Sequence, residues 1–125
     1  MDRNPDIEIY IKNTDAQAIT AWLDSLAGQL DKGEQQPNIQ HYVWHYEGEA
    51  IPVMLHERVV GKAWTSLWFN SSATPWAVDL DCAKAAATAL ATQVRCTANG
   101  WTEGDEPDTW WKVEAESCEE IQWRT

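Results

Sequence analysis

Residues 6–17 read Asp-Ile-Glu-Ile-Tyr-Ile-Lys-Asn-Thr-Asp-Ala-Gln, and the architecture of the chain starts from this stretch. Ile7, Ile9 and Ile11 alternate with Glu, Tyr and Lys, which is the period of a strand with one buried face. Thr14 is followed three positions later by Gln17, the spacing of a helix capping box. We therefore predict a strand over residues 6–13 that leads directly into a helix over residues 15–30.

An apolar stripe supports this helix. Its members recur at helical spacing: Ile19, Trp22, Leu23, Leu26 and Leu30. Gly33 is placed to end the helix, and residues 31–38 are polar enough to be predicted as a loop.

Two further strands are predicted over residues 39–47 and 51–57, joined by a tight turn at Gly48 and Glu49. This register sets three aromatic side chains opposite three aliphatic ones, namely Tyr42, Trp44 and Tyr46 opposite Leu55, Val53 and Ile51. On the other face, the same register makes His41 and His56 cross-strand neighbours.

The rest of the chain alternates between strands and one more helix. A strand over residues 62–70 has Trp64 and Trp68 on one face and Leu67 and Phe69 on the other, so both faces are apolar. An alanine-rich helix over residues 79–91 begins with Asp79 and Asp81 at its favourable end. Strands over residues 93–97, 109–115 and 119–124 follow, with an acidic loop over residues 98–108.

This order predicts a single α+β domain over residues 1–125, with two helices packed on one face of a mainly antiparallel sheet. The order β-α-β-β-β-α-β-β-β resembles an elaborated ferredoxin-like sandwich. The resemblance is topological and implies no particular activity.

The charge of the chain restricts its partners. It carries 20 acidic and 9 basic side chains, a net charge of −11. Such a chain disfavours nucleic acid, because that affinity depends on Lys and Arg displacing counterions, and it disfavours anionic membranes. A basic partner is favoured instead.

The cysteines and the first residues point to the cytoplasm. Cys82, Cys96 and Cys118 are an odd number without CxxC spacing, as expected of reduced thiols. The chain starts Met-Asp-Arg-Asn-Pro-Asp, without the apolar core of a signal peptide. No apolar run approaches the roughly 20 residues that span a bilayer.

Tryptophan is the unusual component, with nine residues against a single phenylalanine, although all aromatics together make only 10%. Tryptophan therefore largely replaces phenylalanine in a predicted sheet core. No phosphate loop, nucleophile elbow or HExxH motif is present. The sequence accordingly predicts no catalytic residue, cofactor or metal, and leans against an enzyme.

The favoured function is a non-enzymatic protein-binding module of immunity or regulatory type. Small acidic bacterial proteins that neutralise basic toxins share this composition. The predicted surface is an acidic loop flanked by indoles, the composition of an interface hot spot. It comprises Trp101, Glu103, Asp105, Glu106, Asp108, Trp110 and Trp111. Trp110 and Trp111 are adjacent in a strand, so one of them is expected in the core and the other on the outer face.

Two alternatives stay open. The first is a small-molecule-binding domain or enzyme with an aromatic pocket on the sheet, lined by Tyr42, Trp44, Trp64, Trp68, His41 and His56. The second is a homodimer joined through the face that carries His41, Val43 and Met54.

His45 lies about 13 Å along the strand from His41, so these two histidines are too far apart to bind one metal ion.

Overall fold

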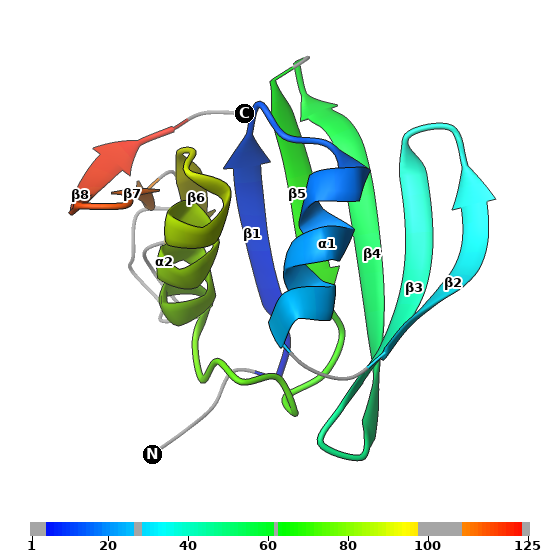
Figure 1. Ribbon diagram of the computed structural model, residues 1–125. Coiled ribbons are helices and arrows are strands. Elements are labelled where there is room, and N and C mark those ends of the chain that lie inside the picture. Colours follow the sequence, from blue (N-terminus) through cyan, green and yellow to red (C-terminus); the bar gives the residue numbers. More distant parts are fainter. Residues whose placement is uncertain (1–4, 27–28, 62, 98–108, 124–125) are drawn as a thin grey trace.

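The computed structural model describes residues 5–26, 29–61, 63–97 and 109–123. This part of the chain forms one antiparallel sheet of eight strands, in the order β2-β3-β4-β5-β1-β6-β7-β8. Figure 1 shows both helices on the same face of that sheet. The elements are β1 (Ile7–Lys12), α1 (Ala16–Leu26), β2 (Gln29–Gln36), β3 (Ile39–Tyr46), β4 (Glu49–Val60), β5 (Trp64–Phe69), α2 (Asp79–Leu90), β6 (Val94–Thr97), β7 (Thr109–Glu114) and β8 (Ser117–Gln122). The predicted α+β class, with two helices on one sheet face, is confirmed.

Strand β1 lies inside the sheet, between β5 and β6. Its three isoleucines are fully buried, as the alternation predicts. The helix that follows is capped by Asp15, whose Oδ1 accepts a hydrogen bond from the Ala18 backbone N–H at 2.8 Å. The capping-box prediction therefore has the cap one residue too early, since Thr14 was the expected cap.

The predicted end of α1 and the predicted polar loop are wrong. α1 ends at Leu26, and β2 (Gln29–Gln36) pairs antiparallel with β3. This strand has little apolar alternation because it is an edge strand with exposed side chains, Leu30 being only half-buried. Gly33 does not end the helix. It lies in β2, where an added Cβ would come within 3.2 Å of the His41 carbonyl oxygen.

The β3–β4 hairpin has a different register from the predicted one. Its turn is at Glu47 and Gly48, both with positive φ (49° and 84°), as in the type I′ turn that suits a two-residue hairpin. Trp44 therefore pairs with Ile51 instead of Val53. Since the shift is by two residues, each side chain keeps its face. His41, however, lies opposite Met54 and not opposite His56.

Helix α2 connects β5 to β6 across β1, because β1 lies between those strands in the sheet. Its buried side chains are Cys82, Ala83, Ala86 and Ala87. Such small side chains allow the helix to lie close on β1, β6 and β7. The predicted alanine-rich helix and its packing on the sheet are confirmed.

The main core lies between the helices and the sheet. Trp44 of β3 is fully buried there, and Trp76, in the segment between β5 and α2, bridges α1 to the sheet. The Trp76 ring stacks on Trp22 of α1 at 5.6 Å between centroids and on Trp44 at 6.1 Å. Three of the nine tryptophans thus pack against one another in the main core.

Candidate functional site

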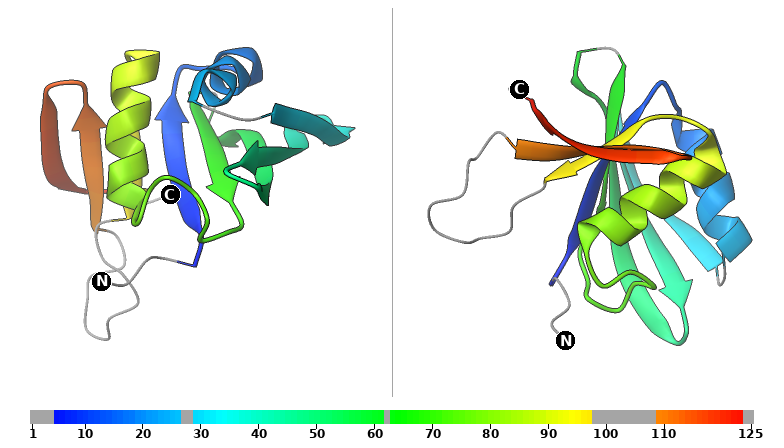
Figure 2. Two further views of the ribbon diagram at one scale, coloured as in Figure 1. Left: turned by 60° about the horizontal axis from the view of Figure 1, so that its bottom comes forward. Right: turned by 90° about the vertical axis from the view of Figure 1, so that its left-hand side faces the viewer.

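One face of the sheet has no helix on it. In Figures 1 and 2 both helices lie on the opposite side, and β6, β7 and β8 are strongly rotated relative to β1 and β5. We call this surface the helix-free face. Its side chains follow from the strand pairings and include Glu8, Tyr10, His41, Val43, His45, Met54, His56, Trp64, Ser66, Trp68, Arg95, Trp110 and Lys112.

At one end of this face four aromatic rings pack together, and two of them contact an arginine. Trp123 lies 4.8 Å from both Trp64 and Trp110, centroid to centroid, and 5.7 Å from Tyr10. Tyr10 also meets Trp110 edge to face at 5.3 Å. The guanidinium carbon of Arg95 lies 4.5 Å from the ring centroid of Trp123 and 4.7 Å from that of Trp64. We call these five residues the aromatic cluster.

The aromatic cluster has the properties of a second core. Trp64 is only 8% exposed, although it faces away from both helices. Partial burial lowers the pKa of Arg95, but a guanidinium remains charged at any physiological pH. Its Nε donates to Gln93 Oε1 at 2.9 Å. The charge is therefore held by indole faces and an amide, and the cluster ties Trp123 to β1, β5, β6 and β7.

The middle of the helix-free face combines an indole with carboxylates. Trp68 Nε1 donates to Asp6 Oδ2 at 2.7 Å, and Trp68 pairs across the sheet with Glu8 and with Met54. Burial, and secondly the charge of Asp6, raise the pKa of Glu8. The pKa of Tyr10 is raised as well, by burial and then by Glu8. We call Asp6, Glu8, Met54 and Trp68 the acidic–aromatic patch.

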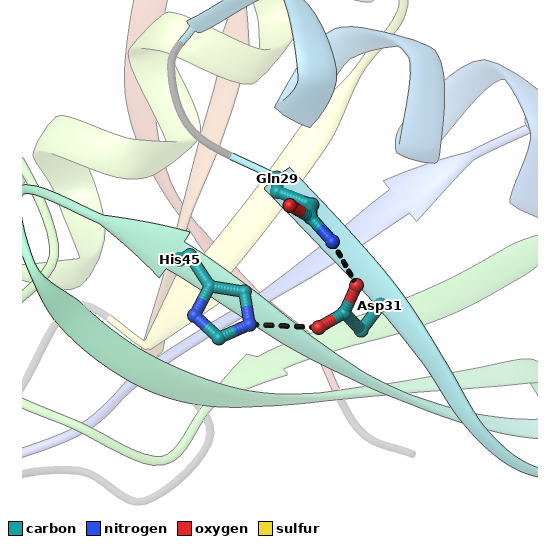
Figure 3. A network of polar contacts seen from close by, with 3 residues as sticks. All are labelled: Gln29, Asp31 and His45. Carbon is teal, nitrogen blue, oxygen red and sulfur yellow. Dashed lines mark hydrogen bonds and ion pairs between the residues drawn. The ribbon is translucent and has the colours of Figure 1, made fainter.

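The far edge of the same face carries a hydrogen-bonded triad, drawn in Figure 3. His45 Nε2 lies 2.8 Å from Asp31 Oδ2, and Gln29 Nε2 donates to Asp31 Oδ1 at 2.5 Å. The hydrogen bonds from His45 and then Gln29 lower the pKa of Asp31. The His45 and Asp31 side chains are 44% and 50% exposed, so this network joins edge strand β2 to β3 and encloses no site.

The histidines form no metal centre. His41 faces Met54, while His56 pairs with Ile39 and Ser66. Among the described residues no group of three His, Cys, Asp or Glu side chains could hold a metal ion. The predicted direct pairing of His41 with His56 is therefore wrong, because it depended on the register that the hairpin does not adopt; in the observed register the two are diagonal neighbours on the same face.

The predicted aromatic pocket does not form as one unit. Tyr42 and Trp44 belong to the main core beneath the helices, whereas Trp64 and Trp68 lie on the helix-free face with His41 and His56. A sheet separates the two pairs of rings. The sequence pattern does not decide which face of the strand over residues 62–70 is toward the helices. The predicted pocket therefore combines side chains from opposite faces of the sheet.

The predicted partner-binding set falls largely outside the described residues. Trp101, Glu103, Asp105, Glu106 and Asp108 all lie there. The two remaining indoles are separated as expected, because Trp110 lies in the aromatic cluster and Trp111 packs against the main core. Trp110 thus has a structural role in addition to any binding role.

The two buried thiols, Cys82 and Cys96, are not poised for nucleophilic chemistry. Cys82 and Cys96 are buried and free, and Cys118 is exposed and free. Burial raises the pKa of Cys82 well above its ordinary value, and nearby Asp79 adds to the effect. The pKa of Cys96 is raised to about 12, again chiefly by burial. These values disfavour the thiolate that a nucleophile requires.

Sequence reasoning missed Tyr10, Arg95 and Trp123 as members of a site. The alternation in β1 could have indicated Tyr10, because it places this aromatic side chain on the face opposite the three isoleucines. Trp123 carried no such signal, because in the sheet β1, β6 and β7 lie between β8 and the strand of Trp64.

Comparison with protein-family models, curated proteins and solved structures finds no match to this chain. Of the helices in the described ranges, none combines the length and the hydrophobicity needed to cross a membrane.

Proposed function

We propose that this protein is a non-enzymatic binding module that presents the acidic–aromatic patch on the helix-free face to a basic protein partner. The observation that carries the proposal is the part-exposed Trp68, fixed by Asp6 and adjoining Glu8 on a sheet face with no helix over it. A rigid indole surrounded by carboxylates is suited to a Lys- or Arg-bearing surface.

Charge complementarity supports a basic partner. The net charge is −11, and the few cationic side chains include His45, paired with Asp31, and Lys112, paired with Glu119. On the helix-free face, Arg95 is held by two indoles and Lys112 by Glu119. Asp6 and Glu8 have no such cation among the described residues, so an incoming positive charge would meet uncompensated carboxylates.

The finer form of the proposal is a bacterial immunity-type or regulatory protein that acts in the cytoplasm. Its support is compositional, since small acidic proteins that neutralise basic toxins share this charge. The acidic residues predicted to bind the partner, Glu103, Asp105, Glu106 and Asp108, lie outside the described residues and stay candidate contacts under this proposal. Trp110 contributes to binding, under this proposal, through the rim of the aromatic cluster.

The ferredoxin-like relationship is also proposed. Leaving aside the β2–β3 pair, the chain runs β1, α1, β4, β5, α2, β6, the β-α-β-β-α-β order of that fold. The four strands adjoin as β4-β5-β1-β6, with β1 and β5 in the interior. The extra strands β2 and β3 on one side, and β7 and β8 on the other, would be the elaborations.

The proposal is tested with matched variants of the full chain. Tagged wild-type protein captures partners from a bacterial lysate, bound proteins are identified by mass, and each basic candidate is produced and titrated calorimetrically. Trp68→Ala is expected to weaken binding by roughly 30-fold or more, as for a hot spot. Glu8→Gln, which keeps shape and removes charge, is expected to weaken it about 10-fold, and less at high salt.

Thr88→Ala, on the exposed side of α2, is the control and should bind as wild type. A partner whose affinity is unchanged by both Trp68→Ala and Glu8→Gln would refute the proposed surface.

A homodimer through His41, Val43 and Met54 is the second candidate, because these side chains are part-exposed on the uncovered face. It predicts a dimer mass at neutral pH that falls to a monomer mass under mild acid, as the histidines charge. A monomer mass under both conditions excludes it.

A further inference from the structure

A groove of about 660 Å³ lies on the other side of the sheet, between α1 and the strands β2, β3 and β4. Figure 1 shows that no helix lies over β2 and β3 on this face, and the residues that line the groove come from these two strands, from β4 and from α1. The polar side chains that matter for its chemistry are Asp24, Lys32, Gln35, Gln40, Tyr42 and Glu57. Its size is that of a small-molecule site.

The two glutamines direct their N–H groups to the backbone. Gln40 Nε2 donates to the Gln36 carbonyl oxygen at 3.2 Å, and Gln35 Nε2 donates to the His41 carbonyl oxygen at 3.0 Å. Each amide oxygen is left as an acceptor. Gln40 Oε1 is buried and has no hydrogen-bond partner among the described residues. A buried acceptor without a donor is destabilising, so a donor that enters the groove and meets this amide after a small rotation would remove that cost.

The charges of the groove favour the same kind of ligand. Asp24 of α1, Glu57 of β4 and Lys32 of β2 all line the groove, which gives it an excess of one negative charge. Glu57 lies close enough to Tyr42 to add to the effect of burial in raising the pKa of that phenol. Tyr42 therefore remains a neutral hydroxyl. Acceptors outnumber donors along the groove.

We infer that this groove binds the guanidinium group of a small ligand. A guanidinium has five N–H donors in a planar fork and no acceptor, which matches carboxylate and amide oxygens contributed by α1, β2, β3 and β4. This inference is independent of the partner proposed for the helix-free face, because the groove lies on the opposite side of the sheet.

The test uses the full chain and two probes of the same shape. n-Butylguanidinium and the neutral n-butylurea are each titrated while backbone amide shifts are followed by NMR. n-Butylguanidinium should cause saturable shifts at groove residues such as Thr20 and Gln35, with a dissociation constant of about a millimolar. n-Butylurea should bind at least about five-fold more weakly, since it lacks the charge.

Variants locate the binding. Glu57→Gln is expected to weaken n-butylguanidinium binding at least about five-fold. Glu49→Gln makes the same substitution in the same strand at the far end of the β3–β4 hairpin, and should leave binding unchanged. Thermal melts of both variants verify that the fold is retained, and Asp24→Asn provides a second test from α1.

A Gly-Arg-Gly peptide that binds more tightly than n-butylguanidinium would show that the group arrives on a polypeptide, and the reverse would indicate a free ligand. Equal binding of both butyl probes, unchanged affinity in Glu57→Gln and Asp24→Asn, or shifts confined to other surfaces would each overturn the inference. None of these outcomes affects the test of Trp68 and Glu8.

Discussion

The aromatic cluster ties Trp123, which follows β8, to the rest of the fold, and replacing Trp123 by alanine tests this. Trp123 follows the last strand, yet its ring meets Trp64 of β5 at 4.8 Å and Trp110 of β7 at 4.8 Å. A side chain just beyond the last residue of an edge strand is ordinarily tolerant of substitution. We expect Trp123 to be an exception because its contacts reach four other strands.

The magnitude follows from those contacts. Each of three aromatic pairs contributes about 0.5 kcal/mol or more beyond burial, and the stacked Arg95 at 4.5 Å contributes about 0.5–1 kcal/mol. Trp123→Ala should therefore lower the free energy of unfolding by at least about 2 kcal/mol, because the burial of the ring adds to these terms. For a chain of this length that corresponds to a fall in Tm of at least about 8 °C.

Urea denaturation followed by far-UV circular dichroism measures the loss without relying on the indole that is removed. Glu120→Ala, an exposed neighbour on β8, is the control and should change stability by less than about 0.5 kcal/mol. Trp123→Phe retains a ring and should recover about half of the loss. A double-mutant cycle with Arg95→Ala should return a coupling of about 0.5–1 kcal/mol. If Trp123→Ala is no more destabilising than Glu120→Ala, the second core contributes nothing and this reasoning is wrong.

Three predictions concern ionisable groups. Hydrogen bonds lower the pKa of Asp31, so their stabilisation of the fold is present above its ordinary pKa and is lost as pH falls through the lowered value. NMR titration should find that His45→Gln raises the pKa of Asp31, and an unchanged pKa would contradict the hydrogen bond from His45. The raised pKa of Glu8 means that stability falls as pH rises from its ordinary to its raised value; Asp6→Asn should lower this pKa only in part, since burial is the larger cause, and complete restoration would refute that ranking. Iodoacetamide should modify the native chain once, at the exposed thiol of Cys118, and three times in denaturant, as intact mass would show; rapid native modification of either buried thiol would contradict the packing of α2.

Much of the fold could be predicted because most strands have one apolar face. β1 alternates cleanly, and α2 combines alanines with two aspartates at its start, so local pattern and tertiary environment agree. β2 could not be predicted. Its hydrogen bonds come from β3 and its side chains are exposed, so no periodicity of its own distinguishes it from a loop. The additional Leu30 at helical spacing made α1 look longer than it is.

The register of the β3–β4 hairpin shows a second limit. Placing the turn at Gly48 and Glu49 or at Glu47 and Gly48 satisfies the same alternation, since the two registers differ by two residues. In both registers the same side chains face the main core, with Trp44 opposite either Val53 or Ile51. Each residue of β3 pairs two positions earlier in β4 than predicted, so His41 lies opposite Met54 instead of His56. The error had no effect on the predicted fold.

The aromatic cluster was harder to predict because it depends on the curvature of the sheet. Trp64 and Trp123 meet although β1, β6 and β7 lie between their strands in the sheet, and no pattern in the sequence encodes that rotation. The consequence for function is that some of the predicted binding indoles also stabilise the fold. Trp110 packs within the aromatic cluster and Trp111 against the main core, so truncating either should lower stability together with any affinity. Trp68 lies outside both cores with its N–H fixed on Asp6, so its truncation is the one that can separate partner binding from folding.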